Sequence, residues 1–146
     1  MRYAVAALAA LIAFPSAALA CSCMDTDDPV ELRDLAKDAP RGAVALVEVE
    51  AITGYDPTKK HGETVRVTRT FVGQVPQSFE ITRREFASGA SCDDILQPGQ
   101  KRVVLLFPVT GSISYRISGL CTNHLLEKPV FRDAVAAQLG SAGERG

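Results

Sequence analysis

Residues 43–52, AVALVEVEAI, alternate between apolar and acidic side chains over their second half. Successive side chains of an extended strand point to opposite faces, so Val47, Val49 and Ala51 share one face. The glutamates between them fall on the other. This alternation predicts a strand with one face in a hydrophobic core and the other in water.

Four more segments, each next to a turn that contains glycine or proline, predict strands. They cover residues 63–71, 78–83, 102–107 and 114–120. The segment 102–107 is the most apolar of them, which favours a central place in a sheet. Residues 53–62 contain glycine, proline and lysine and predict a solvated loop.

Helices are predicted on either side of the strands. Asp28 and Pro29 suit the start of a helix over residues 29–37. A second helix begins at Pro129, and its apolar stripe consists of Val130, Phe131, Ala134, Val135 and Leu139. These elements favour a mainly β domain, a five-stranded antiparallel barrel of the oligonucleotide/oligosaccharide-binding (OB) type with flanking short helices. Residues 140–146 are small and polar and are expected to be a frayed tail.

The first twenty residues predict a secretory signal peptide. Arg2 precedes an apolar stretch too short to span a bilayer, and Ala18-Leu19-Ala20 is a small-x-small cleavage pattern. Cleavage would leave one domain, residues 21–146, that begins at Cys21. We expect this domain to be secreted or periplasmic, with no transmembrane segment.

A cysteine directly after the cleavage site has a second fate, as the lipidated residue of a lipoprotein. Lipoprotein signals usually place leucine three residues before that cysteine, where this chain has Ala18. Leu19 lies one residue too late. We therefore expect a free α-amine on Cys21 in preference to a lipid anchor.

The chain is almost neutral, with 16 basic and 17 acidic side chains and a formal charge of −1. Such a balance does not attract nucleic acid or an anionic membrane. We expect a monomer with no cofactor and no nucleic-acid partner. The arginines of the predicted strands form either a solvated face or a basic patch for an acidic partner, and they are Arg66, Arg69, Arg83 and Arg84.

Four cysteines in an exported chain predict two disulfides. A bond between Cys21 and Cys23 would close a strained ring, so each is expected to pair with a distant cysteine. The partners are Cys92 and Cys121, and these residues alone leave both pairings open. Either pairing ties the mature N-terminus to the barrel.

This cysteine framework resembles the inhibitory domain of the tissue inhibitors of metalloproteinases and bacterial members of the netrin-like superfamily. The shared features are a mature start Cys21-Ser22-Cys23, a third cysteine before the fourth strand and a fourth after the fifth. Other similar stretches are Phe71-Val72-Gly73, Val75, Ser91-Cys92, Gly99, residues 104–107 and Cys121-Thr122. The chain departs from the animal inhibitors after Cys23, where Met24 and the acidic residues Asp25, Asp27 and Asp28 replace an apolar, proline-containing start.

The resemblance implies a function, a partner and a disulfide pairing. In this family the α-amine and carbonyl oxygen of the first cysteine chelate the catalytic zinc of a metalloprotease and displace its water. Carried over, Cys21 is the zinc ligand and Ser22 enters the main specificity pocket. Cys23 and Met24 extend this contact ridge, and a neighbouring ridge is formed by Gly89, Ala90 and Ser91. The implied disulfides are Cys21–Cys92 and Cys23–Cys121.

Three other interpretations compete with inhibition. The thiols and thioether of residues 21–24 would suit Cu(I), but export favours their oxidation. A cysteine enzyme would pair Cys92 or Cys121 with His61 or His124, but a disulfide leaves no nucleophile. We expect no enzyme, with His61 in a solvated loop and His124 capping the last strand. The third alternative is a non-inhibitory binding module, since one barrel serves many functions.

Overall fold

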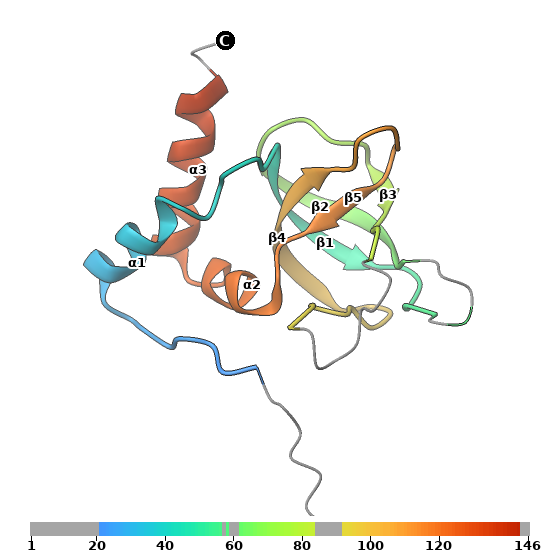
Figure 1. Cartoon of the computed structure of the whole chain (residues 1–146), viewed down its shortest axis with the longest axis horizontal. Helices are drawn as coiled ribbons and strands as arrows, with labels where there is room; N and C mark the ends of the chain where they lie inside the picture. Colours follow the sequence, from blue (N-terminus) through green and yellow to red (C-terminus); the bar gives the residue numbers. More distant parts are fainter. Residues whose placement is uncertain (1–20, 57, 59–61, 84–91, 144–146) are drawn as a thin grey trace, which may run out of the picture.

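The computed structural model describes residues 21–56, 58, 62–83 and 92–143. The predicted signal peptide lies outside this range, as do His61 and Arg84. Along the described chain the elements are α1 (Pro29–Ala36), β1 (Ala45–Ala51), β2 (Thr64–Val72), β3 (Ser78–Glu80), β4 (Lys101–Pro108), β5 (Tyr115–Ile117), α2 (Leu120–Leu126) and α3 (Pro129–Gly143) (Figure 1). None of the helices in this part of the chain has the length and apolarity needed to cross a membrane.

The strands form one antiparallel sheet in the order β3-β2-β1-β4-β5. The sheet curls until its two edges meet. Ile81, just after β3, forms a parallel bridge with Tyr115 of β5, and the Thr82 amide donates to the Tyr115 carbonyl at 2.7 Å. The result is a partly closed five-stranded barrel, which confirms the predicted fold class.

The sheet separates two hydrophobic cores. Inside the barrel lie Ala45, Val47, Val49, Ala51, Val65, Phe79, Ile81, Leu96, Val104 and Leu106. The second core lies between the outer face of the sheet and the helices, which Figure 1 shows on one side of the barrel. It contains Leu32, Ala36, Leu46, Val103, Leu105, Leu126, Phe131 and Val135.

Strand β1 is therefore more buried than its alternation predicts. Its outer face begins with Leu46, which is fully buried against the helices, and only Glu48 and Glu50 of this strand keep partial exposure. The acidic residues mark the part of the strand that the helices do not cover. Alternation identified the strand correctly and missed the packing on its second side.

Three details correct the sequence-based expectations. The fifth strand ends at Ile117, and helix α2, which was not predicted, begins at Leu120. His124 lies inside this helix and does not cap a strand. Helix α3 continues to Gly143, so much of the expected frayed tail is helical; residues 144–146 lie outside the described range.

Candidate functional site

The N-terminal segment, residues 21–28, is extended and leads into α1 as the blue stretch of Figure 1. Two disulfides attach it to the domain. Cys21 is bonded to Cys92 and Cys23 to Cys121, with Cα–Cα distances of 5.6 and 5.1 Å. This is the pairing that the family resemblance implied, and it leaves no free cysteine.

Exposure alternates along this segment. Cys21 and Cys23 are partly buried by their disulfides, whereas Ser22 is exposed and Met24 is 54% exposed. An extended chain places successive side chains on opposite sides. With the cysteines turned towards the domain, Ser22 and Met24 are presented to solvent, as a contact ridge requires.

A backbone hydrogen bond links the parts of the chain that contain the two partner cysteines, Cys92 and Cys121. The Cys92 carbonyl accepts a hydrogen bond from the Leu120 amide at 3.0 Å, next to Cys121 in the first turn of α2. Two residues after Cys92, the buried Asp94 accepts a hydrogen bond from Asn123 Nδ2 at 2.9 Å. The loop that holds Cys21 and the helix that holds Cys23 are thus one connected unit.

Ser118 fastens α2 to the sheet. Its hydroxyl donates to Asn123 Oδ1 and accepts from the Leu105 amide of β4 at 2.9 Å. Asn123 Nδ2 also donates to the Ser118 carbonyl at 3.0 Å. Because Ser118 and Asn123 are both buried, these bonds are shielded from competition with water.

A buried ion pair supports the loop after Cys92 from the other side. Arg83 Nε donates to Glu63 Oε2 at 2.8 Å, and Arg83 Nη2 donates to Glu63 Oε1 and to the Asp94 carbonyl. Glu63 Oε1 also accepts from the Leu96 amide at 2.9 Å. The side chains of Arg83 and Glu63 are 7% and 0% exposed. Arg83 therefore belongs neither to a solvated face nor to an exposed basic patch.

Arg66 and Arg69, the other arginines of the predicted basic patch that the structure describes, have different partners. Arg66 pairs with Glu50 at 2.9 Å, and the guanidinium of Arg69 lies 4.7 Å from the centre of the Phe71 ring. Of the polar residues that support Cys92, the sequence singled out only Arg83, and for a surface role. An isolated glutamate or asparagine has no periodicity that would reveal its burial.

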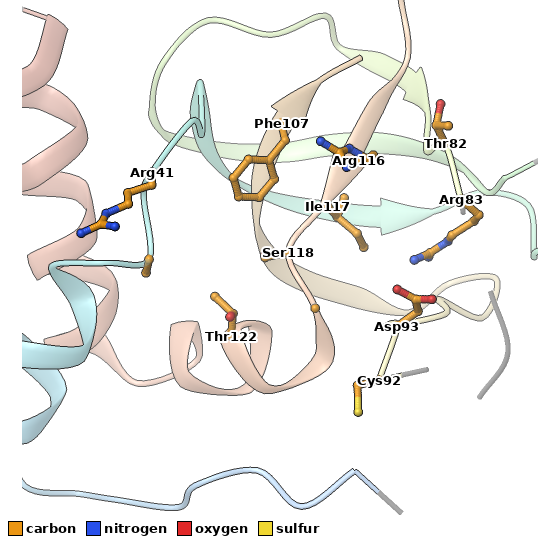
Figure 2. A pocket seen from close by; sticks show the side chains of 12 residues that line it. Arg41, Thr82, Arg83, Cys92, Asp93, Phe107, Arg116, Ile117, Ser118 and Thr122 are labelled. Carbon is orange, nitrogen blue, oxygen red and sulfur yellow. The ribbon is translucent and has the colours of Figure 1, made fainter. Parts of the chain in front are cut away.

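A polar recess of about 580 Å³ borders Cys92 (Figure 2). Figure 2 shows Arg41 at the left of it, Phe107, Arg116 and Ile117 along the strands above, and Thr122 of α2 below. Three arginines line it, of which Arg83 is paired with Glu63 and Arg41 lies 2.7 Å from Asp38. Cys92, the disulfide partner of Cys21, lines this recess, but no residue of the N-terminal segment does.

The chemistry required by two rival interpretations is not available in this oxidised state. All four sulfurs are in disulfides, so they offer neither a thiolate nucleophile nor a pair of thiols for Cu(I). The His124 Nε2 atom lies 3.9 Å from Asp25 Oδ1 at the surface. Across residues 21–56, 58, 62–83 and 92–143, no three His, Cys, Asp or Glu side chains are placed to hold a metal.

The structure brings four of the predicted site residues together as one anchored segment, namely Cys21, Ser22, Cys23 and Met24. The predicted second ridge, Gly89-Ala90-Ser91, lies outside the described residues. Comparisons of the chain with protein-family models, curated proteins and solved structures found no match. The function of this site therefore has to be inferred from its geometry.

Proposed function

We propose that the mature protein is an exported inhibitor of zinc metalloproteases, similar in action to the tissue inhibitors of metalloproteinases. The α-amine and carbonyl oxygen of Cys21 act as a bidentate ligand for the zinc of the target. The single observation that carries the proposal is the double anchoring of the N-terminal segment, through Cys92 and Cys121, to one hydrogen-bonded unit.

The chemistry of zinc proteases suits this ligand. Their zinc has three protein ligands and an open fourth position that holds water. The pKa of a reference α-amine is about 7.7 to 8.0, against about 10.4 for lysine. Because a metal ligand must be deprotonated, the α-amine loses less affinity to proton competition at neutral pH than a lysine would.

Anchoring lowers the entropy cost of docking. The disulfides Cys21–Cys92 and Cys23–Cys121 attach the first and third residues of the segment to the folded domain, so local chain motion does not move the chelating end freely. A segment held in its bound conformation gains affinity because less order has to be imposed on binding. Ser22, exposed between the anchors, is the side chain proposed to enter the specificity pocket.

The proposal is tested by blocking the α-amine. The mature protein that begins at Cys21 should inhibit at least one member of a panel of zinc metalloproteases. A variant with one extra alanine before Cys21 should lose inhibition by at least about a hundredfold, because an acylated nitrogen is no longer a basic metal ligand. Its melting temperature should stay unchanged, since the added residue touches neither core.

A matched control carries the extra alanine after Gly146 and should inhibit like the unextended protein. Equal inhibition by the two N-terminal forms would contradict zinc chelation. If the mature protein leaves the whole panel active, the domain is better described as a secreted binding module that uses another surface.

A further inference from the structure

Lys128, in the turn between α2 and α3, contacts the N-terminal segment far from it in sequence. Its Nζ donates to Asp25 Oδ1 at 2.9 Å, to the Thr26 carbonyl at 2.6 Å and to Asp27 Oδ1 at 2.6 Å. A lysine ammonium has three N–H donors, and each of them has an acceptor in this one segment.

The arrangement differs from an ordinary surface ion pair. Exposed pairs contribute little because ordering two long side chains costs about as much as the attraction gains. Here the Lys128 side chain is only 18% exposed, although Asp25 and Asp27 are 77% and 95% exposed. One acceptor is a backbone carbonyl, so the contact restrains the main chain at Thr26 as well as two carboxylates.

The ionisation of the partners agrees with this geometry. The hydrogen bond from Lys128, together with its charge, holds the pKa of Asp25 below its ordinary value. Hydrogen bonds to Asp27 and Asp25 raise the pKa of Lys128. The lowered pKa keeps the Asp25 carboxylate ionised, and the raised pKa keeps the Lys128 amine protonated.

The Lys128 contact lies in the stretch of chain that directly follows Cys23, the second disulfide-bonded cysteine. Cys23 is the last disulfide anchor, and helix α1 begins after its N-cap Asp28, whose carboxylate accepts from the Val30 amide at 2.8 Å. Residues 24–27 connect these two fixed points. Lys128 holds three of these four residues, and the fourth is the exposed Met24.

We propose that Lys128 is a positioning residue of the N-terminal segment. It is a third, non-covalent anchor that fixes how Met24 is presented near Cys21, the proposed zinc ligand. The inference rests on the proposed function. Lys128 does not touch the zinc or the protease. It acts through Met24, which lies between the disulfide anchor at Cys23 and the lysine anchor at Asp25.

The test compares K128M with wild type in the mature, disulfide-bonded protein. Methionine keeps the apolar stem and removes the charge and all three donors. Hydrogen exchange measured by mass spectrometry should become faster in residues 24–27. The inhibition constant should rise about tenfold, because the segment must then be ordered on binding. The melting temperature should change little.

Two variants serve as controls. K128R retains the charge and several donors and should recover most of the affinity. K37M removes another lysine–aspartate contact, Lys37 Nζ to Asp34 Oδ1 at 2.6 Å, at the end of α1. It should change neither exchange in residues 24–27 nor inhibition.

A double-mutant cycle tests the route through Met24. If Lys128 acts by presenting Met24, the effects of M24A and K128M on the inhibition constant will not add. Fully additive effects of the two substitutions would contradict the proposal that Lys128 acts through Met24.

If hydrogen exchange at residues 24–27 is unchanged in K128M, Lys128 does not anchor the segment. If exchange becomes faster but inhibition is unchanged, Lys128 has no positioning role in inhibition. If wild type inhibits no zinc protease, the proposed function fails, and the positioning role fails with it. The exchange data then decide separately whether Lys128 orders the segment.

Discussion

Cys92 shows at the scale of a single residue how the site is built. Its φ of 57° lies in the left-handed region, which non-glycine residues adopt at a cost of about 1 to 3 kcal/mol. Such a conformation persists only when its surroundings determine it. At Cys92 these are the disulfide to Cys21 and the hydrogen bond that its carbonyl accepts from Leu120. Cys92, which anchors the proposed zinc ligand, is thus restrained through both its side chain and its backbone.

Gly73 permits a comparison between backbone strain and steric contact. Gly73 and Gly111 both have positive φ, 92° and 76°. A Cβ at Gly73 would overlap the Val44 carbonyl oxygen, whereas one at Gly111 would meet nothing within 4 Å. We expect G111A to lower the free energy of unfolding by about 1 kcal/mol from strain alone. G73A should cost about 2 kcal/mol more, because backbone must move.

Urea denaturation with both disulfides intact measures this difference. Equal losses for the two variants would show that the turn at Gly73 relaxes freely and that its contact with β1 does not constrain the sheet.

At the scale of the elements, the loop after Cys92, helix α2 and the barrel are joined by buried polar groups. Glu63 precedes β2, Arg83 follows β3 and Asp94 follows Cys92, yet the three meet at one place. A buried ion pair contributes little net stability compared with apolar residues, but removing one partner leaves the other charge buried. The network therefore fixes where the loop lies more than it adds to overall stability.

The buried pair leads us to expect a large effect for E63Q. The variant keeps the shape of Glu63 but leaves the buried Arg83 without a counter-charge, and it should lower the free energy of unfolding by about 3 kcal/mol. E50Q is the matched control, because Glu50 pairs with Arg66, whose side chain is 54% exposed. It should cost no more than about 1 kcal/mol.

Chemical denaturation of both variants gives the comparison. Losses of similar size in E63Q and E50Q would contradict the role assigned to the buried pair. An inhibition assay on E63Q, below its melting temperature, should also show weaker binding, since the Cys92 loop loses its support.

The same elements show how much the sequence could predict. Alternation, apolar runs next to glycine or proline turns, and helix-start residues together located all five strands and two of the helices. Helix α2 gave no such signal: it has seven residues, and its N-cap is Gly119, which makes no side-chain capping bond. The partners Glu63, Arg83 and Asp94 are brought together by barrel closure, which local sequence does not reveal. The cysteine framework predicted the anchored segment, and the lysine that holds its far end was missed.

At the scale of the whole molecule, the proposed inhibitory segment is separate from the structures that stabilise the fold. The two cores lie inside the barrel and between sheet and helices, and none of their members comes from residues 21–28. The segment is attached at the outside by two disulfides and Lys128. Changes at the α-amine should therefore alter binding and leave folding intact, so a loss of inhibition can be assigned to the lost zinc ligand.

The most direct measurement is the visible absorption spectrum of an inhibited metalloprotease in which cobalt(II) replaces zinc. We expect the mature protein to change the cobalt bands, because the Cys21 nitrogen and carbonyl oxygen replace the bound water. The form with an extra alanine before Cys21 should leave the spectrum unchanged. Inhibition by the mature protein with unaltered cobalt bands would contradict chelation and place the source of affinity elsewhere on the domain.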